Sequence, residues 1–226
     1  MNASTTPPQF EKDLLAVLDD KSLLKHPFYV DWTNGTLPMD RMQEYARQYF
    51  HFESAFPRFL SAIHTRVQSP AIRQHLLDNL WDEEHGDRNH VALWLEFAAA
   101  LGVDAESVRT SVPGAETAAL VEHFRNVCAN APVSEALATL FAYEGQVPRV
   151  AWEKMRGLTE HYGMQPSQFE FFSVHLVADV SHAGAEMAAI AETAGESNSG
   201  VVEAAERACE RLLAFLDGCY RPAAAV

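Results

Sequence analysis

The chain has 226 residues, of which 48% are hydrophobic and 21% charged, and its formal net charge is −14 at pH 7. This length suits one sizeable core and does not require a second domain. The negative charge argues against nucleic acid or an anionic membrane surface as partner, because both are polyanions. No apolar run approaches the roughly 18 residues of a transmembrane helix, so no membrane partner is expected.

Two further features bear on the cellular compartment. The first ten residues, MNASTTPPQF, lack the basic and apolar regions of a signal peptide. Cys128, Cys209 and Cys219 share no spacing typical of metal or redox chemistry, and an odd number leaves one without a disulfide partner. We therefore expect reduced thiols in a cytoplasmic protein.

Helical periodicity covers almost the whole chain, and alternating strand patterns with hairpin dipeptides are missing. Short breaks rich in Pro, Gly, Asn and Ser separate the periodic stretches. The pattern predicts about seven helices, at residues 9–20, 38–66, 70–101, 115–129, 132–161, 166–194 and 199–219. Because long helices joined by short loops pack as an antiparallel bundle, we expect one all-α domain over residues 9–220. Loose tails are expected at 1–8 and 221–226.

The most regular polar pattern lies in the sixth expected helix. Residues four and seven apart on an ideal helix lie within roughly 60° of each other, so His175, Asp179 and His182 share one stripe. Apolar residues flank this stripe. Such a stripe is either a metal site or a set of hydrogen-bonded core side chains, and the spacing alone does not decide between them.

Two other expected helices carry acidic groups. In the third, Glu83 and His90 stand seven apart on one stripe with Asp87 between them, although this stretch is polar all round and also fits a solvated face. In the fifth, Glu144 lies among apolar residues, where an ionised and unpaired carboxylate costs several kcal/mol. Glu144 is therefore either a ligand or an interhelical hydrogen-bond acceptor beside Tyr143.

Taken together, three carboxylates and three imidazoles would satisfy two metal ions and leave coordination positions open. Nitrogen and oxygen donors without thiolate suit iron, manganese or zinc. Clusters of carboxylates and histidines in a helical bundle are typical of di-iron and di-manganese proteins. The chain has no Glu-x-x-His motif, and its nearest versions begin at Asp87 and Asp179. A standard ferritin-like site is therefore not expected.

Five segments resemble the CADD-like branch of the heme-oxygenase-like proteins, a group that includes the PqqC and TenA folds. They are HPFYVDWTNGTL (26–37), AFPRFLSAIHTR (55–66), LLDNLWDEEHGDRNHVALW (76–94), YEGQVPRVAWEKMRGLTE (143–160) and ADVSHAGAE (178–186). The resemblance implies a seven-helix heme-oxygenase-like bundle, a homodimer and a dinuclear site without heme. It favours Glu83 as a ligand over Asp82, Glu84 and Asp87. The six ligands that it implies are Glu83, His90, Glu144, His175, Asp179 and His182.

CADD-like proteins are implicated in making p-aminobenzoate for folate from their own side chains. The resemblance implies that Tyr29 supplies the ring and Lys154 the amino group, with two iron or manganese ions, O2 and an external reductant. Each chain would then turn over once. Lys154 is the sole lysine after Lys25, although a charge pairing with Glu153 or Glu160 also explains it. Packing at the edge of the core is the alternative for Tyr29.

Tyr45 and Tyr49, four apart in the second expected helix, form an aromatic pair that can face the site. They would relay an electron or a proton, although packing explains them equally well. Two other functions remain open. One is a dimetal oxidase that acts on an external amino acid or fatty acid. The other is a non-catalytic protein-interaction module, which the association of CADD with death domains suggests but which needs no buried ligand set.

Overall fold

The computed structural model describes residues 9–194 and 199–220, and the regular structure in these ranges is entirely helical. This confirms the expected all-α class. The described ranges hold twelve α-helices and two short 3₁₀ helices, so the expected count of seven is wrong. The expected tails at 1–8 and 221–226 lie outside the described residues. The helices are α1 Gln9–Asp20, η1 Leu23–Lys25, α2 Pro27–Asn34, α3 Met39–Glu53, α4 Phe56–His64, α5 Pro70–Glu84, α6 His90–Ala100, α7 Ala105–Arg109, α8 Ala115–Asn130, α9 Val133–Glu144, α10 Val147–His161, η2 Pro166–Gln168, α11 Glu170–Thr193 and α12 Ser199–Tyr220.

Three of the long helices expected from periodicity are each two helices in the structure. The breaks lie between α3 and α4, between α5 and α6, and between α9 and α10. Pro57 and Pro148 stand in the first turns of α4 and α10. Proline is tolerated there because the N–H that it lacks has no partner in the helix, but it does not let the helix continue from the preceding turn. Gly86 adopts a φ of 80° after α5, and the Asn89 side chain then caps α6 by accepting from the backbone N–H of Ala92.

The short helix α2 lies outside the expected set but carries clear terminal signals. His26 Nδ1 accepts a hydrogen bond from the backbone N–H of Phe28, and Pro27 occupies the first helical position. Gly35, with a φ of 72°, ends the helix in the left-handed conformation. This helix brings Tyr29 into the core, where 3% of its surface is exposed.

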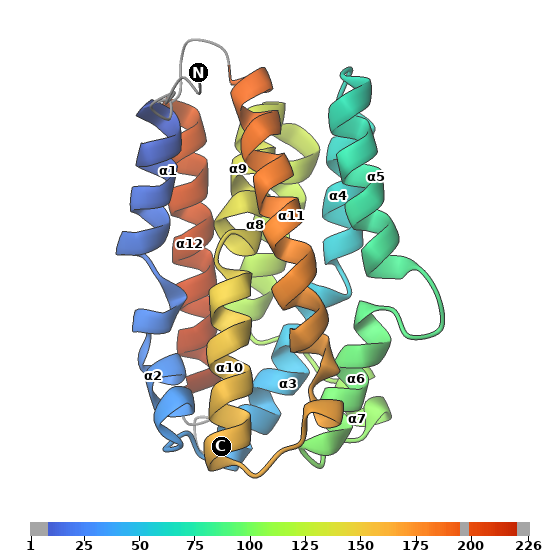
Figure 1. Cartoon of the computed structure of the whole chain (residues 1–226), viewed down its shortest axis with the longest axis vertical. Coiled ribbons are helices and arrows are strands. Elements are labelled where there is room, and N and C mark those ends of the chain that lie inside the picture. The colour runs from blue at the N-terminus through green and yellow to red at the C-terminus, as the bar shows by residue number, and fades with distance from the viewer. Residues whose placement is uncertain (1–8, 195–198, 221–226) are drawn as a thin grey trace, which may run out of the picture.

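The helix α11 runs along the bundle at the front of Figure 1 and packs against α9, α10, α5 and α6. On the other side of α9, α12 packs against α9, α8 and α1. The space between these helices is filled largely by aromatic rings, which hold the neighbouring polar side chains in fixed positions. The largest fully buried aromatic side chains are Trp32, Trp94, Tyr45, Phe28, Phe52, Phe56, Phe59, Phe97, Phe124 and Phe172.

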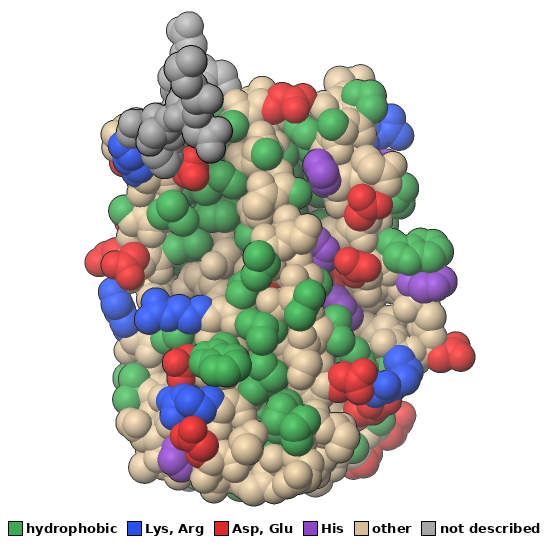
Figure 2. Space-filling view, viewed as in Figure 1, with side chains coloured by type: hydrophobic (Ala, Val, Ile, Leu, Met, Phe, Trp, Pro, Cys, Tyr) green, Lys and Arg blue, Asp and Glu red, His purple; other side chains and the backbone are tan. Residues whose placement is uncertain are grey.

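Figure 2 shows the face over α10 and α11, where hydrophobic side chains gather in the middle of the surface. Exposed apolar residues of these two helices include Trp152, Val177 and Val180. Within residues 9–194 and 199–220, no helix has both the length and the apolar composition of a membrane span.

Candidate metal centre

Each of the three helix breaks lies beside a buried acidic or imidazole group. Glu53 is the last residue of α3, and Glu144 is the last residue of α9. Glu83 stands in the last turn of α5, and His90 begins α6 after the intervening turn. The expected single helical stripe through Glu83 and His90 is therefore wrong, because the chain brings these two side chains together by a turn between two helices. The stripe on α11 is real, since His175, Asp179 and His182 are all buried on one continuous helix.

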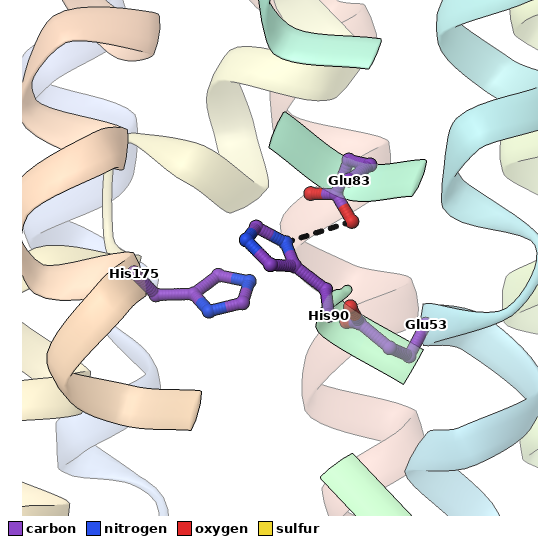
Figure 3. Close-up of side chains that lie close together, drawn as sticks. All are labelled: Glu53, Glu83, His90 and His175. Carbon is purple, nitrogen blue, oxygen red and sulfur yellow. Dashed lines mark ion pairs between the residues drawn. The ribbon is translucent and has the colours of Figure 1, made fainter. Parts of the chain in front are cut away.

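The first group of polar side chains contains Glu53, Glu83, His90 and His175. Each places one possible ligand atom within 4.8 Å of the others, and all four are buried. His90 Nδ1 lies 2.9 Å from Glu83 Oε2, and the rings of His90 and His175 have centroids 4.2 Å apart. In Figure 3, His175 approaches from α11 on one side, the two glutamates lie on the other, and His90 stands between them.

The second group contains Glu144, Asp179 and His182, whose possible ligand atoms also lie within 4.8 Å of one another. His182 Nδ1 lies 3.3 Å from Asp179 Oδ1 and 3.9 Å from Glu144 Oε1. Asn79 Nδ2 donates a hydrogen bond of 2.8 Å to Glu144 Oε1. On its outer side, His182 Nε2 lies 3.2 Å from Asp82 Oδ2, a contact that can orient the ring and leave Nδ1 for a metal ion.

The structure thus brings all six sequence-predicted ligands together in two neighbouring groups. The structure also explains why Glu83, and not another acidic residue of the third expected helix, is the predicted ligand. Glu83 is 4% exposed, whereas Asp82, Glu84 and Asp87 all lie on the surface. The role of the six residues as metal ligands stays a prediction.

Glu53 is a member of the first group that the sequence prediction missed. It is 2% exposed and lies between the buried residues Phe52 and Phe56 in the sequence. The argument that singled out Glu144, a carboxylate among apolar neighbours, applies equally to Glu53. The signal was therefore present, although only the tertiary structure shows that Glu53 faces Glu83 and His90.

Burial and the closeness of several carboxyl groups shift the pKa values in both groups. Burial, together with the charges of neighbouring carboxylates, raises the pKa of Glu53 and of Glu83 well above the usual range. Burial raises the pKa of Asp179 to about 7. Burial also lowers the pKa of His175 well below its ordinary value. For His182, burial alone would lower the pKa, but the hydrogen bond to Asp179 and the nearby carboxylate charges raise it to about 9.

These features fit binding of cations. Glu53 Oε1, Glu144 Oε2 and Asp179 Oδ2 are buried and have no hydrogen-bond partner. A buried carboxylate oxygen without a partner is costly unless a proton or a cation neutralises the group. The donors are carboxylates and imidazoles without thiolate, which is the set that iron, manganese and zinc accept. Two groups of such donors have the composition of a dinuclear site.

A chamber of aromatic side chains adjoins the first group. It has a volume of about 30 Å³, and its walls include Tyr29, Tyr45, Tyr49, Lys154 and His175. Since His175 belongs both to this wall and to the first group, the chamber reaches the metal centre directly. The three tyrosines that the sequence analysis singled out therefore lie next to the predicted ligands.

Lys154 is buried in this chamber, with 5% of its surface exposed. Its Nζ donates a hydrogen bond of 2.7 Å to the hydroxyl of Tyr45, which lies 3.3 Å from the hydroxyl of Tyr29. Burial lowers the pKa of Lys154 to about 7, although the charge of Glu53 opposes this effect. The alternative of a surface ion pair for Lys154 is wrong. Its neighbours Glu153 and Glu160 pair instead with Arg156, an exposed side chain on the outer face of α10.

The remaining tyrosines extend from the chamber towards the first group. The rings of Tyr45 and Tyr49 are stacked, with centroids 5.5 Å apart and planes inclined by 29°. The hydroxyls of Tyr49 and Tyr143 are hydrogen-bonded to each other. Burial raises the pKa of both phenols well above the ordinary value, and the charge of Glu53 raises both further. These tyrosines thus remain protonated and adjoin the acidic group.

Comparisons with known proteins agree with this geometry. A family model described as iron-containing redox enzyme matches residues 43–215. The chain is 43% identical over 223 residues to the 4-aminobenzoate synthase of Nitrosomonas europaea, with 93% of this chain and 91% of that protein covered.

Solved structures share the fold. A TenA homologue from Pseudomonas syringae pv. tomato has a TM-score of 0.83 at 16% identity, with 96% of this chain and 98% of that chain covered. A CADD-like protein of unknown function from Nostoc punctiforme has a TM-score of 0.72 at 17% identity, with 93% and 95% covered. These likenesses confirm the expected heme-oxygenase-like, TenA-like fold. The chain belongs to the iron-containing redox enzymes, and within them to the family of the 4-aminobenzoate synthases.

Proposed function

We propose that this chain forms p-aminobenzoate in an O2-dependent reaction at a dinuclear metal centre, with Tyr29 as the source of the ring and Lys154 as the source of the amino group. Because both side chains are consumed, each chain turns over once. The observation that carries the proposal is a buried amine linked through Tyr45 to a buried phenol, in a chamber that reaches His175. The similarity to a 4-aminobenzoate synthase supports the identity of the product.

The predicted metal-binding residues are Glu83, His90, Glu144, His175, Asp179 and His182, to which the structure adds Glu53. We assign them two divalent ions, iron or manganese, because the donors are oxygen and nitrogen. Reduced ions of this kind, with O2 and an external reductant, supply the oxidising power that amino acid side chains lack. The described site residues are buried, so reactive species formed there are kept from bulk water.

Lys154 suits the role of amino donor because its amine is nucleophilic only without its proton. With a pKa of about 7, about half of the amines are neutral at neutral pH. Tyr45 contacts both Lys154 and Tyr29, and so positions the amine beside the phenol. Tyr45 and Tyr49 are placed to pass electrons and protons between Tyr29 and the first group, since their rings stack.

The size of the chamber favours an internal substrate over an external one. A volume of about 30 Å³ is close to that of a single water molecule, whereas pockets for small ligands measure roughly 300–1,000 Å³. A free amino acid or fatty acid would therefore need the aromatic walls to open. A non-catalytic interaction module would have no use for seven buried ligand-type side chains, so this reading is the least favoured.

The proposal is tested with metal-free protein given iron or manganese, a reductant and O2, but no small-molecule substrate. We expect p-aminobenzoate at no more than one molecule per chain, measured by mass spectrometry. Lys154→Arg should bind metal but form no product, because a guanidinium stays protonated and cannot serve as the amine. Undiminished product from the Arg variant would remove Lys154 from the mechanism, and many turnovers per chain would exclude consumption of the protein.

The other expectations stay predictions. From the resemblance these are delivery of the product to folate synthesis, a homodimer and the absence of heme. From the composition and charge they are a cytoplasmic location and the absence of nucleic-acid and membrane partners.

A further inference from the structure

One buried carboxylate beside the second group belongs to neither group of predicted ligands. Glu186 lies on α11 and is 5% exposed, and neither of its carboxylate oxygens has a hydrogen-bond partner. It stands four residues after His182 and seven after Asp179, so it continues the same stripe of the helix. A carboxylate in such a position is unfavourable unless a proton or a cation neutralises it.

A small cavity adjoins this carboxylate. It has a volume of about 20 Å³ and lies among α5, α9 and α11. Its polar lining residues are His75, Asn79, His182 and Glu186, and the others are apolar. That volume holds one water molecule or one metal ion. Asn79 Oδ1 is likewise buried without a hydrogen-bond partner, although its Nδ2 donates to Glu144. Oxygens without a hydrogen-bond partner thus occur on Glu144 of the second group and on its neighbours Asn79 and Glu186.

We propose that Glu186 is a further ligand of the ion held by Glu144, Asp179 and His182. This inference rests on the proposed function, because it requires that the second group bind a metal ion. Glu186 stands outside the three residues whose ligand atoms lie within 4.8 Å of one another. It reaches the ion by rotation of its own side chain, since residues four apart on a helix have Cβ atoms about 6 Å apart.

With Glu186 as a ligand, the two metal-binding positions differ in their numbers of carboxylate and imidazole ligands. The first group offers two carboxylates and two imidazoles, whereas the second would offer three carboxylates and one imidazole. Hard divalent ions such as Mn²⁺ are favoured by carboxylate oxygens. The second position should therefore bind Mn²⁺ more tightly with Glu186 than without it.

The test is a titration of the full-length metal-free protein with Mn²⁺. Electron paramagnetic resonance measures the concentration of free Mn²⁺ at each step, and the bound ions are obtained by difference. Glu186→Gln keeps the shape of the side chain but removes its charge. It should weaken binding of the second ion by about tenfold or more. Glu192→Gln is the matched control, because Glu192 is an exposed glutamate on the same helix and should leave binding unchanged. Thermal unfolding without metal checks that each variant folds.

The possible results separate the two claims. Two ions bound by the wild type and a weaker second ion in Glu186→Gln support the inference. Two ions bound with unchanged affinity in a folded Glu186→Gln variant would overturn it and leave the proposed dinuclear centre intact. Failure of the wild type to bind a second ion would overturn both. If Glu186→Gln does not fold, Glu186→Asp supplies the same comparison, because the shorter side chain keeps the charge but moves it away from the ion.

Discussion

Replacement of Lys154 by methionine should stabilise the protein in a strongly pH-dependent way. Burial lowers the pKa of Lys154 from its ordinary value of 10.5 to about 7. The folded state therefore binds fewer protons at this position than the unfolded state between about pH 7 and pH 10.5. Stability of the wild type must rise with pH through this window. The destabilisation by Lys154 is largest below pH 7 and vanishes above pH 10.5.

The size of the effect follows from the two pKa values. A tenfold change in proton affinity corresponds to about 1.4 kcal/mol. Lys154 therefore lowers the free energy of unfolding by about 5 kcal/mol at pH 6.5 and by about 1 kcal/mol at pH 9.5. Met has a similar length and no charge, so Lys154→Met removes this cost. The variant also loses the hydrogen bond to Tyr45, which lowers its stability by about 1 kcal/mol at both pH values. The advantage of the variant should thus shrink by about 3–4 kcal/mol from pH 6.5 to pH 9.5.

The assay is urea unfolding of the metal-free wild type and Lys154→Met at both pH values. Titrations of groups far from Lys154 affect both proteins alike and cancel in the difference between them. Glu53 and His175 interact electrostatically with Lys154, so their titrations contribute to the difference. A difference in the free energy of unfolding that does not change with pH would refute the reasoning. It would show that Lys154 keeps its proton in the folded protein, held by the surrounding aromatic rings, whose centroids lie 4.8–5.8 Å from Nζ.

Three other substitutions test the site. His182→Ala should remove the ion of the second group while the fold survives, and unchanged metal content in the folded variant would contradict the assignment of His182 as a ligand. Glu53→Ala should weaken binding in the first group by about tenfold or more, and equal affinity in a metal titration would remove Glu53 from the ligand set. Tyr29→Phe should preserve packing and metal content but abolish p-aminobenzoate, because one-electron oxidation of a phenol is far easier than that of benzene. Product from this variant would exclude Tyr29 as the ring source.

Much of the fold was predictable because apolar periodicity reports helices directly. The breaks at Pro57 and Pro148 were not recognised, since the apolar pattern continues across them and proline is allowed in the first turn of a helix. The short helix α2 was missed, although His26, Pro27 and Gly35 mark its two ends. Periodicity thus located most of the helical stretches but not the breaks between consecutive helices.

Some residues of the candidate site were likewise predictable from the sequence, and others were not. The stripe of His175, Asp179 and His182 was predictable because all three lie on one continuous helix. Glu53 was not identified, because its partners come from other helices and only tertiary packing brings them together. The environment of Lys154 was equally hidden, since burial of a lone lysine leaves no periodic signal in the sequence.

The central claim is that Tyr29 itself becomes the product, and isotopic labelling tests it most directly. Protein is produced with ring-labelled tyrosine, purified, and given iron or manganese, reductant and O2 without any small-molecule substrate. Labelled p-aminobenzoate at no more than one molecule per chain, with mass lost at residue 29 in the peptide map, is the predicted result. Unlabelled product, or an intact Tyr29 in protein that has formed product, would contradict the account.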